Sequence, residues 1–304
     1  MEGNVLLNVA IVGSGTQGSM LAYRSAAFGR RVRVYDLSRA SLDAAQAKLE
    51  VWLKERALAE RFDAFDADAV RARILYTADL GEALEDADLV IENVPEVLAL
   101  KQEVWAGIDA LAPEKTLLTT NSSSLKSSDI GRDVGRKDKT FNLNFMTPTK
   151  DDLVEVMWNK ETSEDTKRKI LAFLRAQENV PIVTEKEIKG FSLNRVWRAM
   201  KKECLRLWSE GYISPDDFDR AFILEWGTDY GPFALMDIVG LDIVRQIELT
   251  YYDESGDPSD LPPKKLDEWV EQGRLGVKSG QGFYTYPHPA YEDPQWLRKG
   301  RAEG

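Results

Sequence analysis

Short apolar runs alternate with amphipathic stretches through the first half of the chain. Val9–Val12 and Val32–Tyr35 have the composition of buried strands, and residues 19–28 between them predict a helix that ends at Gly29. Apolar residues at spacings of three and four then mark one face of a second helix, at Leu42, Ala45, Leu49 and Leu53. This alternation of strand and helix predicts a parallel, doubly wound sheet.

The pattern changes near residue 186. Before that point it predicts further strands at residues 74–77, 89–92, 116–120, 141–145, 153–158 and 180–183, and a helix near 164–177. From Gly190 onward the strand signal stops, and the pattern is mostly helical up to a glycine-rich segment and a tail with prolines. We therefore expect an α/β chain in which a Rossmann-type, doubly wound N-terminal domain (1–186) precedes an all-helical C-terminal domain (187–304).

A glycine-rich turn joins the first strand to the first helix with the spacing G-x-G-x-x-G. Its residues are Gly13, Ser14, Gly15, Thr16, Gln17 and Gly18. Such glycines allow a tight turn, close approach of a pyrophosphate and close packing of helix on strand, while the helix N-terminus binds the phosphates. Asp36 ends the second strand, where it can bind the adenosine ribose and repel a 2′-phosphate, whereas the nearby Arg39 would favour one. We predict an NAD site that prefers NAD to NADP.

Charge and composition exclude several kinds of partner. The 304 residues include 40 Lys and Arg against 51 Asp and Glu, a net charge of −11, so neither nucleic acid nor an anionic membrane surface is expected to bind. No apolar run approaches the roughly 20 residues of a membrane span, and the first residues lack the basic start of a signal peptide. Cys204 is the single cysteine, which excludes an intrachain disulfide and fits the cytoplasm. No metal site is predicted.

Motifs in both halves of the chain are those of a known family. They are Ile91–Glu96, Lys101, Asn121–Leu125, Gly190–Arg195, Gly231–Asp237, Gly273–Gly276 and Lys278–Tyr284. With them the chain resembles the 3-hydroxyacyl-CoA dehydrogenase family over nearly its whole length, including shorter members such as λ-crystallin/gulonate dehydrogenase and diketoreductase. The resemblance implies NAD-dependent, reversible oxidation of a 3-hydroxyl to a 3-ketone, as in fatty acid metabolism.

The resemblance also implies roles for individual residues. Glu96, Lys101 and Asn121 align with positions that contact the cofactor, and Ser123 and Asn194 align with residues that hydrogen-bond the substrate. Each has a structural alternative: a helix ion pair for the first two, a helix cap for the serine segment, and a solvent-facing side chain for Asn194. We favour the functional interpretation.

One departure from the family concerns the catalytic base, a histidine that is oriented by the glutamate of an L-V-E-V segment. Leu153–Val156 keeps that glutamate, Glu155, but Asn144 occupies the histidine position, at a spacing one residue shorter than expected. The only histidine, His288, lies between two prolines and is expected at the surface. Because an amide does not titrate, Asn144 can orient a carbonyl group but cannot accept its proton.

Other groups are left to supply a proton. Lys201 follows Asn194 by two helical turns on the same face, Lys189 precedes the Gly190 motif, and Glu155 can hold a water molecule. For both lysines, solvation at the surface is the simpler interpretation. Loss of the family's activity is a further alternative.

The substrate stays open at this stage. Charges of both signs interleave over residues 41–61, which indicates a solvated helix face with ion pairs and not a site for CoA phosphates. These residues are Lys48, Lys54, Arg56, Arg61, Glu50, Glu55 and Glu60. We weigh three hypotheses: a dehydrogenase or reductase for a 3-hydroxy or 3-oxo compound, CoA-linked or not; an NAD enzyme for another ketone or imine that carries its own acid or base; and an NAD-binding protein with a structural or regulatory role.

A homodimer formed through the helical domain is expected from the family pattern and from one apolar segment. The apolar residues are Phe233, Leu235, Met236, Ile238, Val239 and Leu241. The same residues fit an intramolecular core equally well.

Overall fold

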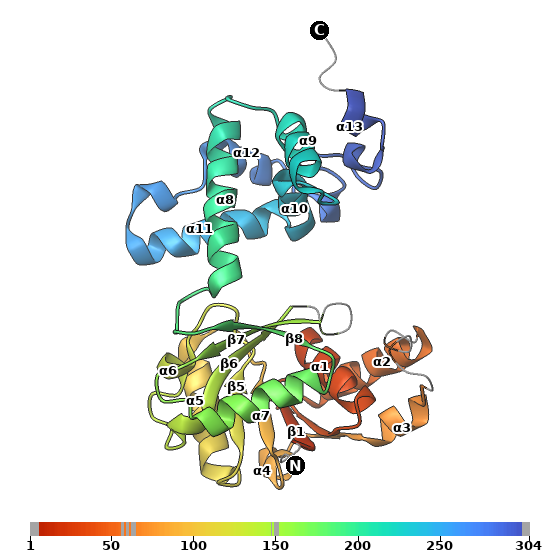
Figure 1. The fold of residues 1–304 in the computed structure, drawn as a ribbon, viewed down its shortest axis with the longest axis vertical. Helices are drawn as coiled ribbons and strands as arrows, with labels where there is room; N and C mark the ends of the chain where they lie inside the picture. Colours follow the sequence, from red (N-terminus) through yellow and green to blue (C-terminus); the bar gives the residue numbers. More distant parts are fainter. Residues whose placement is uncertain are drawn as a thin grey trace. The chain divides into compact units, whose positions relative to one another are not determined.

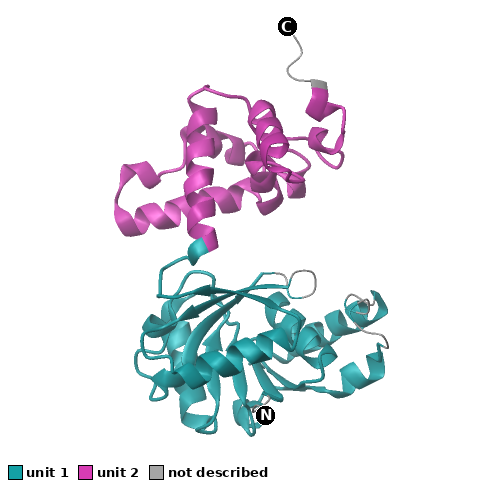
Figure 2. Ribbon diagram, in the orientation of Figure 1, with its two compact units in different colours: residues 1–192 teal, residues 193–304 magenta. Residues whose placement is uncertain are grey.

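The chain forms two compact units, shown in separate colours in Figure 2. The computed structural model describes residues 6–55, 58, 61, 65–146, 148 and 152–299, so Arg56 and Glu60 lie outside the described residues. The first unit comprises residues 1–192 and the second residues 193–304, and each has a hydrophobic core of its own.

The first unit is built on an eight-stranded sheet with the order β3-β2-β1-β4-β5-β6-β7-β8 (Figure 1). The strands are β1 (Asn8–Val12), β2 (Arg31–Tyr35), β3 (Ile74–Thr77), β4 (Leu89–Glu92), β5 (Leu117–Thr120), β6 (Thr140–Phe145), β7 (Leu153–Trp158) and β8 (Val180–Thr184). The parallel arrangement predicted for the first six strands is confirmed. β7 instead pairs antiparallel to β6, because the connection between them is too short for the crossover that parallel neighbours require.

Helices cover both faces of this sheet and bury their apolar stripes against it. They are α1 (Thr16–Ala27), α2 (Arg39–Glu55), α3 (Ala67–Ala72), α4 (Leu80–Leu84), α5 (Leu98–Leu111), α6 (Ser127–Ile130) and α7 (Glu164–Arg175). The predicted apolar face of α2 is confirmed, because all four of its residues are buried: Leu42, Ala45, Leu49 and Leu53. α1 begins at Thr16 and not at residue 19, since the last residues of the glycine turn form its first turn.

The second unit is helical, as the sequence predicts. Its helices are α8 (Ser192–Ser209), α9 (Pro215–Trp226), α10 (Pro232–Val239), α11 (Leu241–Ser255), α12 (Lys264–Glu271) and α13 (Trp296–Lys299). Phe233, Met236 and Leu241 are fully buried in its core, so the intramolecular alternative holds for these three residues. Among the described residues of both units, no helix combines the length and the apolar character that crossing a membrane requires.

Two buried carboxylates explain why the motifs of the second unit take their form. Asp219 accepts hydrogen bonds from two backbone N–H groups at the start of α10, and Asp237 accepts them from the N–H groups of Phe283 and Tyr284. A Cβ atom on Gly282 would lie 2.0 Å from a carboxylate oxygen of Asp237, so only glycine permits this approach. Burial raises the pKa of Asp219 to about 6. These contacts give Asp219, Asp237 and Gly282 structural roles within the second unit.

Candidate cofactor pocket and active site

A pocket of about 740 Å³ lies in the first unit at the carboxyl ends of β1, β2 and β4. β1 stands between β2 and β4, so the strand order reverses at this point of the sheet. Open α/β sheets bind their ligands at such a reversal. The glycine turn lines one side of the pocket, Asp36 and Lys48 another, and Asn93 and Val94 a third.

The three glycines of the turn meet different requirements. Gly13 has a φ of +102°, and a Cβ atom there would lie 2.9 Å from the backbone of Asn93. A Cβ atom on Gly18 would lie 2.0 Å from the carbonyl oxygen of Gly13, so the first turn of helix α1 lies too close to Gly13 for any side chain at position 18. A Cβ atom on Gly15 would have no neighbouring atom within 4 Å. The outer glycines therefore shape the turn, and Gly15 leaves room for a ligand at the N-terminus of α1.

The Asp36 carboxylate fastens the glycine turn to the end of β2. Its Oδ2 atom accepts hydrogen bonds from the backbone N–H of Ser14 at 2.9 Å and from the Ser14 hydroxyl at 2.8 Å, and Oδ1 accepts one from the N–H of Ser38 at 3.0 Å. Arg39, the cation that would favour a 2′-phosphate, forms an exposed ion pair with Asp43 at 3.3 Å. The pocket thus presents a negative group where a ribose is expected.

We expect Asp36→Ala to weaken NADH binding about tenfold and to reduce the preference for NADH over NADPH, because it removes both hydrogen-bond acceptors and the charge that repels a 2′-phosphate. Fluorescence titration of the two cofactors measures both effects. Asp133→Ala is the matched control, since Asp133 carries the same charge in an exposed ion pair with Arg132 and does not line the pocket. NADPH binding tighter than NADH binding in the native protein would contradict the assignment.

Lys101 lies in the interior of the first unit beside the pocket. Its ammonium contacts Glu92 Oε1 at 2.8 Å, the carbonyl oxygen of Val94 at 2.9 Å and Glu96 Oε2 at 3.4 Å, and the residue is 1% exposed. Burial raises the pKa of Glu92, which is fully buried. An ammonium has three N–H donors, and three oxygen atoms already surround this one. Lys101 therefore positions the β4–α5 turn, whose residue Val94 lines the pocket.

The serine segment after β5 is held by Glu96. Glu96 Oε1 accepts a hydrogen bond from the Ser122 hydroxyl and another from the Ser124 hydroxyl at 2.6 Å. Burial acts to raise the pKa of Glu96, but these hydrogen bonds and the Lys101 charge hold it below its usual value. Ser123, between the two anchored serines, is exposed. Glu96 therefore connects the cofactor pocket to the segment that carries Ser123.

Asn121 connects the ends of three neighbouring strands. Its Nδ2 atom donates to Asn93 Oδ1 at 2.9 Å, and its Oδ1 atom accepts the N–H of Phe145 at 2.9 Å. Asn93 lines the pocket after β4, and Phe145 ends β6. Sequence reasoning missed Asn93, although it lies within the first recognised motif. This bridge brings the cofactor pocket and the predicted catalytic strand together.

Asn144 and Glu155 face each other across the β6–β7 hairpin. They are register partners in the antiparallel ladder, and Asn144 Nδ2 donates to Glu155 Oε2 at 3.1 Å. Asn144 is 6% exposed and Glu155 is 1% exposed. Directly opposite residues of an antiparallel pair have their side chains on the same face of the sheet. The spacing between Asn144 and Glu155, one residue shorter than expected, therefore still brings the two side chains together. The buried amide–carboxylate pair lies one residue from Phe145 and its bond to Asn121.

Helix α1 holds the segment that follows Asn144. Gln17 Nε2 donates to the carbonyl oxygen of Met146 at 3.0 Å, and the fully buried Arg24 donates to that of Pro148 and to Asp152, each at 3.0 Å. The sequence did not indicate Arg24, since an arginine in an amphipathic helix usually faces water. Its contacts tie the cofactor-binding helix to the hairpin of the predicted active site.

The comparisons with known proteins agree with this geometry. Residues 8–188 match the NAD binding domain of 3-hydroxyacyl-CoA dehydrogenase, and residues 190–286 match the C-terminal domain of that enzyme. The chain belongs to the 3-hydroxyacyl-CoA dehydrogenase family. It is accordingly an NAD-dependent oxidoreductase, and the relatives named as dehydrogenases act on hydroxyl groups.

Three known proteins are similar to this chain over most of its length. Human mitochondrial hydroxyacyl-coenzyme A dehydrogenase is 31% identical over 289 residues, which cover 93% of this chain and 92% of the relative. The 5-formyl-3-hydroxy-2-methylpyridine 4-carboxylate 5-dehydrogenase of Mesorhizobium japonicum is 30% identical over 288 residues, covering 93% and 91%. A solved diketoreductase, described as acting on dicarbonyl compounds, has a TM-score of 0.83 and 32% identity, and the match covers 93% of this chain and all of that one.

NAD fits the pocket that this family member presents. The open space at Gly15 and the positive end of α1 suit a pyrophosphate, and Asp36 offers a carboxylate to a ribose. Bound there, the cofactor supplies the hydride acceptor or donor, and the residues of the chain bind and orient it.

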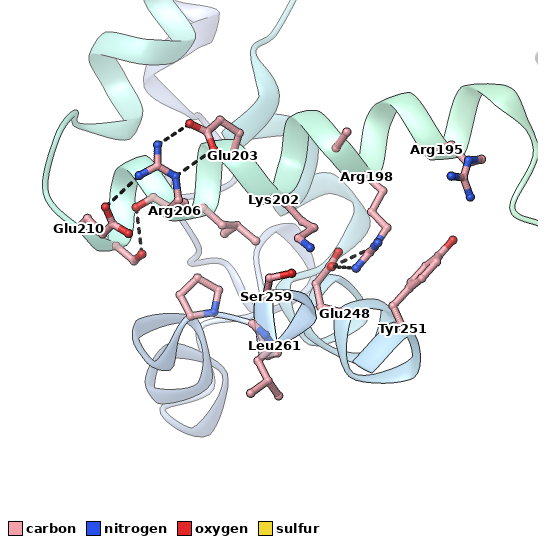
Figure 3. A pocket seen from close by; sticks show the side chains of 15 residues that line it. Arg195, Arg198, Lys202, Glu203, Arg206, Glu210, Glu248, Tyr251, Ser259 and Leu261 are labelled. Atoms are coloured by element: carbon pink, nitrogen blue, oxygen red, sulfur yellow. Dashed lines mark hydrogen bonds and ion pairs between the residues drawn. The ribbon is translucent and has the colours of Figure 1, made fainter. Parts of the chain in front are cut away.

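A second pocket, of about 700 Å³, lies in the second unit along α8 (Figure 3). Arg198 on its wall donates to Glu248 Oε2 at 2.8 Å, and behind it the Lys201 ammonium lies 2.8 Å from Glu248 Oε1. Lys201 is 1% exposed, so the expectation of a solvated surface lysine is wrong. Burial lowers the pKa of Lys201. Its ammonium is engaged by Glu248 inside this unit, which argues against a role as the proton donor.

The other residues considered for proton transfer or substrate binding differ in how far they are exposed. His288 is exposed, as expected for a surface residue. Lys189 is half-buried, and its solvation at the surface stays a prediction. Asn194 is half-buried in the first turn of α8, and its part in substrate binding stays a prediction.

Proposed function

We propose that this protein reduces an activated ketone, or converts a carbonyl compound that carries its own acid–base group, and that it oxidises ordinary 3-hydroxyacyl-CoA poorly. The observation that supports this is the Asn144–Glu155 hydrogen bond, at 3.1 Å inside the β6–β7 hairpin. In the proposed alignment, Asn144 replaces the family's catalytic histidine, and Glu155 is the glutamate that orients it.

The chemistry follows from what an amide can do. Oxidation of an alcohol releases a hydride to NAD and a proton to a base, and Asn144 cannot accept that proton. Reduction takes a hydride from NADH and a proton from solvent or a nearby acid, while the Asn144 N–H can donate a hydrogen bond to the carbonyl oxygen and stabilise its developing charge. The site is therefore better suited to reduction than to oxidation.

We assign Ser123 and Asn194 to binding the substrate oxygen, and Glu155 to organising the path of the proton. Glu96, Lys101 and Asn121 are assigned to the cofactor side, where Lys101 acts by positioning. In support, Ser123 is exposed beside the anchored serines, and Asn121 joins the cofactor pocket to β6. Alanine at Ser123, Asn194 or Glu155 should reduce turnover far more than NADH affinity.

The substrate need not be linked to CoA. Two similar proteins are named for substrates without CoA, a formylpyridine carboxylate and dicarbonyl compounds. We therefore propose a keto or related carbonyl compound as the substrate, with a 3-oxoacyl-CoA as the alternative.

A panel assay tests this function directly. NADH oxidation is followed with 3-oxo acids, diketones, aldehydes of aromatic acids and 3-oxoacyl-CoAs at equal concentration. We expect turnover with at least one carbonyl substrate and a much slower reverse reaction with 3-hydroxybutyryl-CoA and NAD. NADH binding without turnover of any compound would argue against the proposal and favour a structural or regulatory role.

We also propose a homodimer formed through the second unit. Ile238 on α10 and Ile243 and Ile247 on α11 are exposed by 47%, 46% and 36%, and burial between two copies would remove this apolar surface from water. Light scattering at micromolar concentration should give twice the 34.3 kDa mass of the chain, and Ile243→Glu should reduce it. A native mass near that of one chain would exclude the dimer.

A further inference from the structure

Lys48 is a cation on the wall of the cofactor pocket. It lies on α2, where Ser41, Ala44 and Lys48 follow helical spacing and line the same pocket as Gly15 and Asp36. Lys48 Nζ is 3.3 Å from Thr16 Oγ1. Since Thr16 is the first residue of α1, the ammonium lies at the helix end where a pyrophosphate is expected.

Lys48 does not follow the ion-pair pattern expected for its helix. On α2, Arg39 pairs with Asp43 and Glu50 pairs with Arg71. Over the described part of the chain, Lys48 has no carboxylate partner, and the side chain is half-buried. An ammonium beside the positive end of a helix is repelled by the helix dipole, unless an anion binds between them.

The charges that line the pocket favour a pyrophosphate between Lys48 and the N-terminus of α1. The other charged residues among those that line it are Asp36 and Glu103, both acidic. A dinucleotide brings a doubly charged pyrophosphate, which needs compensation that these residues do not provide. We infer that Lys48 donates a charge-assisted hydrogen bond to the cofactor pyrophosphate and is a binding residue for NAD.

This inference goes beyond the proposed function and does not depend on the substrate. The diphosphate of CoA has the same chemistry, but Lys48 shares its pocket with Asp36 and Gly15, which favours the cofactor. The 2′-phosphate of NADPH is a third anion that the same side chain could meet. Binding measurements without substrate separate the three.

The test compares Lys48→Met with Lys54→Met. Lys54 is exposed on the same helix and does not line the pocket. Dissociation constants are measured for NADH, NADPH, ADP-ribose, adenosine and CoA. For Lys48→Met we expect NADH, NADPH and ADP-ribose to bind about tenfold more weakly, with adenosine and CoA unchanged. The difference should shrink as salt is raised, because the side chain is partly exposed. Lys54→Met should change none of them.

Each other outcome overturns the inference. Unchanged NADH binding would show that Lys48 does not meet the cofactor, and an equal loss for adenosine would indicate a change in pocket shape. A loss confined to NADPH would assign Lys48 to the 2′-phosphate, and a loss confined to CoA would assign it to the substrate. Each of these results leaves the proposed reduction to be decided by the panel assay.

Discussion

Asn144→His is expected to oxidise 3-hydroxybutyryl-CoA with NAD about 10²–10⁴-fold faster than the native protein, because a positioned proton acceptor contributes a factor of that size. The imidazole would stand opposite Glu155, whose carboxylate already accepts a hydrogen bond from Asn144 at 3.1 Å. That carboxylate would hold the ring and stabilise the imidazolium formed as the proton transfers. Initial rates of NADH formation in both proteins measure the gain.

The pH profile shows whether the new imidazole is responsible. Only the neutral ring accepts a proton, so kcat/KM for oxidation should rise as pH increases through the imidazole pKa, which is near 6.5 in model peptides. The charge of Glu155 favours the protonated ring and moves this rise to higher pH. The native protein has no imidazole at this position and should lack the rise, when both are assayed from about pH 6 to about pH 10.

Glu155→Gln in both backgrounds is the matched control. In the native background it should slow the reduction, and combined with Asn144→His it should reduce the gain and move the rise to lower pH. NADH affinity should stay unchanged in all variants, which verifies that the fold is intact. Native oxidation as fast as that of Asn144→His would defeat the hypothesis and show that another group accepts the proton.

Lys101→Met is expected to lower the free energy of unfolding by about 3–5 kcal/mol, because it removes one partner of a buried ion pair. Glu92 is fully buried and lies 2.8 Å from the Lys101 ammonium. Without that charge, the carboxylate must stay ionised in the interior or bind a proton. Urea unfolding at neutral pH measures the loss.

Two further variants make this prediction specific. Combining Lys101→Met with Glu92→Gln should recover most of the stability, since no unpaired charge is then buried. Lys115→Met breaks a pair with Asp88 in which the lysine is 57% exposed, and it should lower stability by less than about 1 kcal/mol. An equally small loss for Lys101→Met would mean that the buried pair contributes little, and that Lys101 is better explained as a direct cofactor ligand.

The parts of the fold that were predicted correctly depend on local pattern. The apolar face of α2 and the strand–turn–helix around Gly13 follow from spacings within about 20 residues, and the structure has both. The cofactor pocket follows too, because the glycine turn and Asp36 come from consecutive elements. The reversal of β7 was not predicted, since strand direction depends on how the hairpin closes and not on the strand's own residues.

The environment of charged side chains could not be predicted in the same way. Arg24 and Lys201 each lie in a helix whose pattern suggests a solvated cation, yet both are buried. Their partners are distant in sequence or on another element, such as Asp152 for Arg24 and Glu248 for Lys201. Helical periodicity shows which residues share a face, but not whether a distant carboxylate lies opposite that face.

By itself, the sequence determined the Rossmann-type architecture, the NAD site, the family and the absence of a histidine from the expected catalytic position. These follow from short motifs and from residue counts, which need no knowledge of distant contacts. Only the tertiary structure decided that Asn144 pairs with Glu155, that Lys101 positions the β4–α5 turn, and that Lys48 lies at the N-terminus of α1. Those contacts arise where the sheet brings separate elements together, because long-range pairing and burial set the surroundings of a side chain.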